Sequence, residues 1–189
     1  TTEIYTLSLH DALPILKAVL DQDFYPQTLY TIPSEEFLRE SFAKLKKIGI
    51  NTIRHHVKVP DPKYMDIADE VGLIVWQDAP HFDLFSDEGS EELLELIDGA
   101  VRRDSHHPSL CLYSIINESW GINQTDPRQV KWLIEAYERF KERFPGIVWI
   151  DNSACLGNYH LKSDLNDYHF YVSSIDRQDK WNSDRKSVV

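Results

Sequence analysis

The stretch that decides the fold reads LCLYSIINESWG over residues 110–121, an apolar run that ends abruptly in polar groups. Its β-prone first half predicts a buried strand. Asn117 and Glu118 follow at the carboxyl end of that strand, with Trp120 close behind them. Parallel barrels present their catalytic groups at this end of their strands, so the stretch indicates a barrel whose site contains Asn117 and Glu118. The alternative is a buried strand that only ends in a polar turn.

On both sides of this stretch, short apolar runs alternate with amphipathic helical patterns. The other predicted strands are residues 16–20, 52–56, 73–77, 147–151 and 168–172. The predicted helices lie between Ser34 and Gly49, over residues 62–71, after Ser90 as N-cap, and after Asp126 as N-cap. Such alternation predicts a parallel sheet, either open or closed into a barrel.

Polar residues follow nearly every predicted strand, which favours the barrel over the open sheet. They are Asp21 and Gln22; Arg54, His55 and His56; Asp78 and His81; Asn117 and Glu118; Asp151 and Asn152; and His169. No glycine-rich phosphate-binding pattern follows any strand, which weakens a nucleotide-binding interpretation. A complete barrel takes about 250 residues. We therefore expect an α/β fold that is an incomplete (β/α)8 TIM barrel, with about strands 1 to 6 present.

The charge balance narrows the choice of partners. The chain has 189 residues and a formal net charge of −11. A nucleic acid or an anionic membrane would need a basic face, so neither is expected as a partner. No apolar run approaches the length that crosses a bilayer, and two cysteines are too few for a disulfide framework.

The two ends of the chain differ from its middle. The first fifteen residues, TTEIYTLSLHDALPI, resemble the translation of a common sequencing adaptor, and the last six, DRKSVV, resemble the same adaptor read from the other side. We therefore expect residues 1–15 and 184–189 to be adaptor-derived and residues 16–183 to form the barrel domain. With such ends, the sequence leaves the cellular compartment open.

An asparagine next to a glutamate at a strand end suits a particular chemistry. A carboxylic acid among apolar and aromatic groups can hold a proton near neutral pH and donate it. In glycoside hydrolysis one carboxyl group protonates the leaving oxygen while a second attacks or activates water. We expect Glu118 to be that acid/base, Asn117 to bind a substrate hydroxyl, and Trp120 to form a wall for a sugar.

Four runs of sequence, taken together and in order, resemble one family. They are KIGINTIR at residues 47–54, ADEVGLIVWQD at 68–78, DSHHPS at 104–109 followed by NESWG at 117–121, and DLNDYHFY at 164–171. These runs resemble the catalytic TIM barrel of glycoside hydrolase family 2, the β-galactosidase and β-glucuronidase family. The resemblance covers nearly all of residues 16–183, which is more specific than any single motif.

The resemblance implies a retaining glycosidase that hydrolyses O-glycosidic bonds of a β-galactoside-like or β-glucuronide-like carbohydrate. Glu118 would be the general acid/base, and Asn117 would lie near the 2-hydroxyl of the sugar. Arg54 would lie at the floor of the site and orient a carboxylate by a charged hydrogen bond, with a purely structural ion pair as an equal alternative. The further substrate-binding candidates are Asp78, His81, Trp120 and His169. For Asp78 and His169, plain capping of a strand end is the alternative.

Two departures from the family pattern limit what can be carried over. After the arginine, many members have Ser-His-Tyr-Pro, whereas this chain has His55-His56-Val57-Lys58, so sugar selectivity is not transferred. The nucleophile of the family is a glutamate at the seventh strand, and the matching runs stop at the sixth. The resemblance therefore implies that this chain alone is inactive as a glycosidase.

Other interpretations stay open at this point. Six histidines at or near strand ends suggest a metal, but neighbouring histidines on a strand point to opposite faces and no zinc-type spacing is present. No metal and no other cofactor is therefore predicted. A retaining barrel glycosidase of another, cellulase-like family is one alternative, and a non-catalytic carbohydrate-binding barrel is another. The full-length protein could be a homo-oligomer.

Overall fold

Six strands pair in a single parallel sheet, in the same order as they occur in the chain. They are β1 (Ala18–Asp21), β2 (Thr52–His55), β3 (Ile74–Asp78), β4 (Leu110–Asn117), β5 (Val148–Cys155) and β6 (Tyr168–His169). This computed structural model describes residues 15–155, 157–169 and 171. Sequential order with parallel pairing is the arrangement of a barrel wall, because each strand returns beside the one before it.

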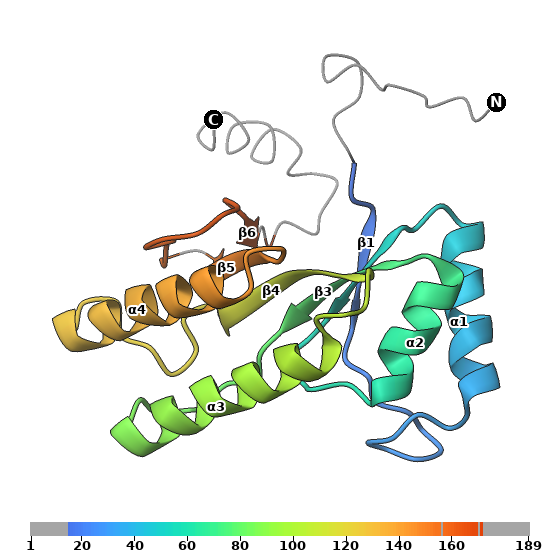
Figure 1. Ribbon diagram of the computed structural model, residues 1–189, viewed down its shortest axis with the longest axis horizontal. Coiled ribbons are helices and arrows are strands. Elements are labelled where there is room, and N and C mark those ends of the chain that lie inside the picture. The colour runs from blue at the N-terminus through green and yellow to red at the C-terminus, as the bar shows by residue number, and fades with distance from the viewer. Residues whose placement is uncertain (1–14, 156, 170, 172–189) are drawn as a thin grey trace.

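Helices join the first five strands. They are α1 (Glu35–Lys47), α2 (Pro62–Val71), α3 (Asp87–Asp104) and α4 (Pro127–Arg143). Figure 1 shows the helices outside the fan of strands, with α1 packed beside α2. The chain therefore forms a parallel half-barrel, and the prediction of an incomplete TIM barrel is confirmed.

The helix ends follow from local chemistry. Asp126 accepts a hydrogen bond from the backbone of Arg128, and Pro127 occupies the first turn of α4, as predicted. The predicted N-cap of α3 was wrong. Ser86, not Ser90, caps this helix by accepting from the N–H of Gly89 at 3.0 Å. Ser90 lies inside the first turn, where its hydroxyl donates to the carbonyl of Asp87 at 2.8 Å.

The β5 strand is longer than predicted. It continues four residues beyond the expected end at residue 151 and stops at Cys155. Asp151 and Asn152 therefore lie within the strand, fully buried, rather than behind it. The last predicted strand, residues 168–172, is observed at its first two residues, and part of it falls outside the described residues.

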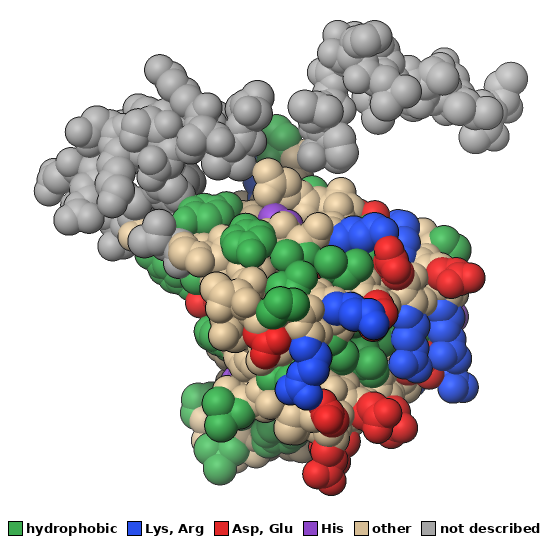
Figure 2. Space-filling model, turned by 90° about the vertical axis from the view of Figure 1, so that its left-hand side faces the viewer, with side chains coloured by type: hydrophobic (Ala, Val, Ile, Leu, Met, Phe, Trp, Pro, Cys, Tyr) green, Lys and Arg blue, Asp and Glu red, His purple; other side chains and the backbone are tan. Residues whose placement is uncertain are grey.

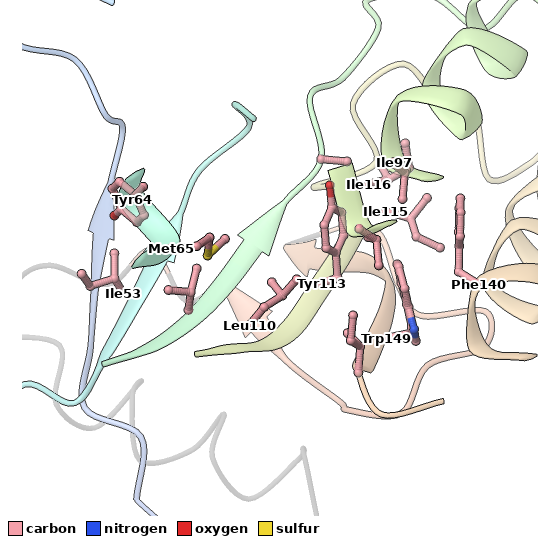
Figure 3. Close-up of a cluster of buried hydrophobic side chains, with 14 of the residues drawn as sticks. Ile53, Tyr64, Met65, Ile97, Leu110, Tyr113, Ile115, Ile116, Phe140 and Trp149 are labelled. Atoms are coloured by element: carbon pink, nitrogen blue, oxygen red, sulfur yellow. The ribbon is translucent and has the colours of Figure 1, made fainter. Parts of the chain in front are cut away.

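The core lies between the sheet and the helices, where aromatic rings from three elements meet (Figure 3). The Trp149 ring of β5 stacks on Phe140 of α4 with centroids 5.0 Å apart, and it lies 5.2 Å from Tyr113 of β4. Its indole N–H donates to the carbonyl of Phe144 at 3.1 Å, so this donor stays paired although the ring is buried. This packing anchors β4, the strand that precedes Glu118.

The helical surface is charged but mixed in sign. Figure 2 shows Lys and Arg side chains interspersed with Asp and Glu on the face turned to the viewer. Among the ion pairs of the described helices, Arg128–Asp87 at 3.0 Å and Lys131–Glu135 at 3.5 Å have largely exposed side chains. Exposed pairs of this kind contribute little to stability. We read this face as a solvated helix surface.

Candidate active site

The turn after β4 has an unusual backbone. Glu118 and Ser119 both have positive φ, at 51° and 58°, a conformation that costs a residue with a side chain roughly 1–2 kcal/mol. The neighbouring strand holds the turn in place: the N–H of Glu118 donates to the carbonyl of Ser153 at 2.8 Å. Asn152 accepts from the N–H of Ser119 at 2.7 Å and donates to its hydroxyl at 3.0 Å. Asn158 donates to the Glu118 carbonyl at 3.0 Å. These hydrogen bonds thus fix the backbone position of Glu118, from which its side chain extends.

A cavity of about 400 Å³ lies at this end of the strands. Its lining residues are Leu20, Gln22, Arg54, His56, Asn117, Glu118, Trp120, His169 and Tyr171. Of the described residues that line it, Glu118 is the only carboxylate. Six of the polar residues that the sequence singles out at strand ends therefore converge on one cavity, as expected for a barrel: Gln22, Arg54, His56, Asn117, Glu118 and His169.

Arg54 joins three strand ends beneath the cavity. Its Nε donates to Asp78 Oδ2 and its two terminal nitrogens contact Asn117 Oδ1 and His169 Nε2, all at 2.7 Å. The guanidinium carbon also lies 4.5 Å from the centre of the Trp76 ring. The side chain is only 11% exposed, so Arg54 acts as a buried structural link between these three partners. Arg54 thus lines the cavity and forms the ion pair with Asp78 that was the structural alternative, while a role in orienting a carboxylate of the substrate stays a prediction.

The bond from Arg54 determines the proton position on His169. A guanidinium can only donate, so Nε2 of His169 must accept. The ring hydrogen then sits on Nδ1, which donates to Glu118 Oε1 at 2.5 Å. The Tyr171 hydroxyl donates to the same oxygen. No donor among the described residues bonds Oε2 of Glu118, so this oxygen is available for a ligand.

Two predicted residues lie elsewhere. Asp78 is fully buried under Arg54, and Oδ2 also contacts His56 Nδ1 at 2.8 Å. His81 packs its ring against Trp120, with centroids 4.7 Å apart. Neither is among the residues that line the cavity, which corrects the expectation that Asp78 lines it: hydrogen bonds with Arg54 and His56 hold its carboxylate beneath the cavity. A substrate contact of His81 stays a prediction.

The other five predicted residues, Asn117, Glu118, Arg54, Trp120 and His169, do line the cavity. Their contact with a substrate stays a prediction. His56, Gln22, Leu20 and Tyr171 were not chosen as site residues, although two of them stood among the polar strand ends. For Gln22 and His56, the position directly after a strand was the available signal. Asn158, which lies on a loop, gave none.

A partly buried histidine, His160, holds the loop between β5 and β6 through two carboxylates. His160 Nδ1 lies 2.9 Å from Asp151 Oδ1, and Nε2 lies 3.2 Å from Asp167 Oδ1. Burial alone would lower the pKa of His160, but the hydrogen bonds to the two carboxylates raise it to about 10. The same loop carries Asn158, which holds the backbone of Glu118. Protonation of His160 therefore supports the turn that places the acid.

The stability of the chain should depend on this histidine. An unfolded histidine has a pKa of about 6.5, so the folded state binds the proton more tightly. The free energy of unfolding should be highest below about pH 6.5 and fall by about 1.5–3 kcal/mol on approaching pH 10. Urea unfolding across this pH range measures the effect. His160→Gln should flatten that slope, whereas His106→Gln, at an exposed position, should keep it; equal slopes in both variants would contradict the assignment.

Two features are not found in the part of the chain that the structure describes. No group of three or more His, Cys, Asp or Glu side chains there could hold a metal ion. No helix within those same ranges is long and apolar enough to cross a membrane.

Comparisons with known proteins agree on one family. Residues 31–145 match the family model described as Glycosyl hydrolases family 2, TIM barrel domain. The chain is 28% identical over 110 residues to a β-glucuronidase of Bacteroides fragilis, a match that covers 50% of this chain and 15% of the relative. It is 29% identical over 102 residues to a β-galactosidase of Arthrobacter sp., covering 45% of this chain and 10% of the relative. The chain thus spans a small part of these relatives.

Solved structures show the same fold. The crystal structure of an FMN-binding β-glucuronidase from Facaelibacterium prausnitzii L2-6 superposes with a TM-score of 0.77 at 18% identity, covering 94% of this chain and 29% of that chain. At this identity the likeness establishes the fold alone. The family model, however, matches more than half of the chain, and the half-barrel agrees with it. The chain therefore belongs to glycoside hydrolase family 2 and forms part of the TIM barrel domain of that family.

Proposed function

We propose that this chain supplies the acid/base half of a retaining glycosidase site, with Glu118 as the general acid/base. One observation carries the proposal: Glu118 follows β4 directly, lines the cavity, and is held through one oxygen by His169. Membership of family 2 supports glycoside hydrolysis as the reaction class. Because the family match covers part of much longer relatives, the activity belongs to a completed barrel.

The two carboxylate oxygens of Glu118 would have different roles. Oε1 accepts from His169 and Tyr171, so Oε2 is the oxygen that would carry the transferable proton. It would protonate the glycosidic oxygen as that oxygen leaves the sugar, and the carboxylate would later take a proton from the attacking water. In retaining enzymes the second carboxylate lies about 5 Å away and attacks the sugar. That nucleophile would have to come from outside the described residues.

Asn117 is prepared for a hydroxyl ligand. Arg54 donates to its Oδ1 at 2.7 Å, which fixes the orientation of the amide. The NH2 group of Asn117 can then donate to a sugar hydroxyl next to Glu118. Trp120, on the cavity wall, offers an aromatic face to the ring. These contacts support a sugar substrate, and the names of the relatives support a β-linked hexose or hexuronic acid.

The chain alone should not turn over a glycoside. Glu118 is the only carboxylate among the described residues that line the cavity, and one carboxylate alone can give neither a glycosyl intermediate nor an activated water beside the acid. Incubation with p-nitrophenyl β-D-galactoside and p-nitrophenyl β-D-glucuronide should release no nitrophenol beyond the rate seen with Glu118→Gln. Turnover that depends on Glu118 in the isolated chain would contradict this division of the site.

A longer protein that carries this chain and completes the barrel tests the acid directly. There, Glu118→Gln should lower kcat/KM for p-nitrophenyl glycosides by about 10²–10⁴-fold. A 2,4-dinitrophenyl glycoside should react almost as before in the first step, because its leaving group needs no proton. Glu135→Gln, on the exposed surface of α4, is the matched control and should change neither rate. Equal losses for both leaving groups would point to a positioning role, and sugar binding without turnover in the unaltered protein would favour a non-catalytic barrel.

A further inference from the structure

One side chain, that of Gln124, joins two loops at the carboxyl end of the sheet. Gln124 lies on the loop between β4 and α4, and Tyr159 lies on the loop between β5 and β6. The Nε2 of Gln124 donates to the carbonyl of Tyr159 at 2.6 Å, and its Oε1 accepts from the N–H of Tyr159 at 3.1 Å. One side-chain amide thus bonds both main-chain polar groups of Tyr159, as residues of paired strands do.

The segment around Tyr159 is the part of its loop that reaches the acid. Asn158, the residue before it, donates from Nδ2 to the carbonyl of Glu118 at 3.0 Å. Asn152 of β5 donates to the carbonyl of Tyr159 at 3.2 Å and also bonds the N–H and the hydroxyl of Ser119. Two short series of hydrogen bonds therefore lead from Tyr159 to the turn after β4, one to each of its residues with positive φ.

The turn after β4 depends on support of this kind. Residues with side chains adopt positive φ at a cost, so the conformation persists only where the surroundings hold it. Part of the support comes from a loop, and loops are the more mobile parts of a fold. The hydroxyl of Tyr159 adds a third bond between the two loops, because it donates to the carbonyl of Gln124 at 3.3 Å. The acid is therefore held by two loops that are bonded to each other.

We propose that Gln124 is a positioning residue for the acid/base. By holding Tyr159 in place, it keeps Asn158 on the carbonyl of Glu118 and so fixes the direction in which the acid enters the cavity. The proposal rests on the proposed glycosidase function and extends it to a residue that is not among those lining the cavity. Misplacing a catalytic group by about 1 Å can cost about 10²-fold in rate, so the bonds that hold its supporting loop affect proton transfer without touching the substrate.

Two matched substitutions separate positioning from general stability. Gln124→Met keeps the length of the side chain and removes both of its bonds to Tyr159. Gln129→Met is the control, because Gln129 also accepts from a loop N–H, that of Asn123 at 2.7 Å, and donates to Asp126 at 3.1 Å. Both of these partners belong to the loop between β4 and α4. The control therefore loses similar bonds without freeing Tyr159.

Hydrogen exchange of the whole chain tests the positioning without any activity. Gln124→Met should speed exchange at the N–H groups of Glu118 and Ser119 by about fivefold or more, relative to the N–H of Leu133, which is buried inside α4 and reports opening of the whole fold. Gln129→Met should keep that ratio within about twofold of the unaltered chain. An equally unchanged ratio in Gln124→Met overturns the proposal. Gln124→Ala replaces the methionine variant if that one does not fold, and if neither folds, the bonds serve stability instead and the proposal is overturned.

Kinetics of a longer protein that completes the barrel separate this role from the glycosidase site itself. There, Gln124→Met should lower kcat/KM for p-nitrophenyl glycosides by about 10- to 100-fold and keep that for 2,4-dinitrophenyl glycosides within about twofold. Gln129→Met should change neither. Equal losses for both leaving groups, or no loss for either, overturn the positioning role, and a selective loss in Glu118→Gln then leaves the glycosidase function standing. If Glu118→Gln shows no selective loss, the function and the positioning role are both overturned.

Discussion

Replacing Arg54 with alanine should lower the free energy of unfolding by about 3–5 kcal/mol, the usual effect of removing one partner from a buried ion pair. The guanidinium neutralises Asp78, whose side chain is 1% exposed. It also donates to Asn117 and contacts His169. The substitution would leave a carboxylate buried with only His56 beside it. Urea unfolding at neutral pH measures the loss.

The double variant Arg54→Met/Asp78→Asn tests the electrostatic cause. It removes both charges and preserves most of the volume, so it should recover a large part of the stability that Arg54→Ala loses. Arg102→Ala on α3 is the control. Its side chain is 62% exposed and pairs with Asp98 at 2.9 Å, so the expected loss is below about 1 kcal/mol. A loss for Arg54→Ala no larger than that would contradict the scaffold role.

The parts of the fold that the sequence predicted are those that local chemistry determines. A proline at the start and a glycine at the end bounded α2, and its predicted range of 62–71 is the observed one. Ser90 was misread because serine also occurs inside a first turn, where its hydroxyl can bond a nearby carbonyl. The extent of β5 depends on pairing with β4, which no local pattern reveals.

For the candidate site, the sequence predicted which strand ends lie near one another but not the direction of each side chain. Barrel geometry brings strand ends together, so Arg54, Asn117, Glu118 and His169 could be placed near one another from their position behind strands. Whether a strand-end side chain faces the cavity or turns beneath it depends on tertiary contacts. Asp78 turns inward because Arg54 and His56 both form hydrogen bonds with its carboxylate. These tertiary contacts cannot be predicted from the sequence. The loop residue Asn158 acts through hydrogen bonds to the backbone, and no sequence pattern predicts such contacts.

The glycine behind the acid should be the most sensitive small residue in the chain. Gly121 has φ of 76°, and a Cβ there would overlap the carbonyl oxygen of Phe82 and come within 2.5 Å of its ring. Phe82 packs against Phe85 and Trp132, so it cannot move aside without disturbing the contact between the β3–α3 loop and α4. The strained φ and the overlap together should make Gly121→Ala cost about 2–5 kcal/mol of unfolding free energy.

Gly99→Ala is the matched control for this prediction. Gly99 lies on the exposed side of α3, and a Cβ there would meet nothing within 4 Å. Alanine in a helix interior is favoured over glycine by roughly 0.5–1 kcal/mol, so this variant should be slightly more stable than the unaltered chain. The same chemical change should thus act in opposite directions at the two positions. Similar unfolding midpoints for the two variants would mean that the turn behind Glu118 can relax, and the close packing of Phe82 would then not be what holds that turn.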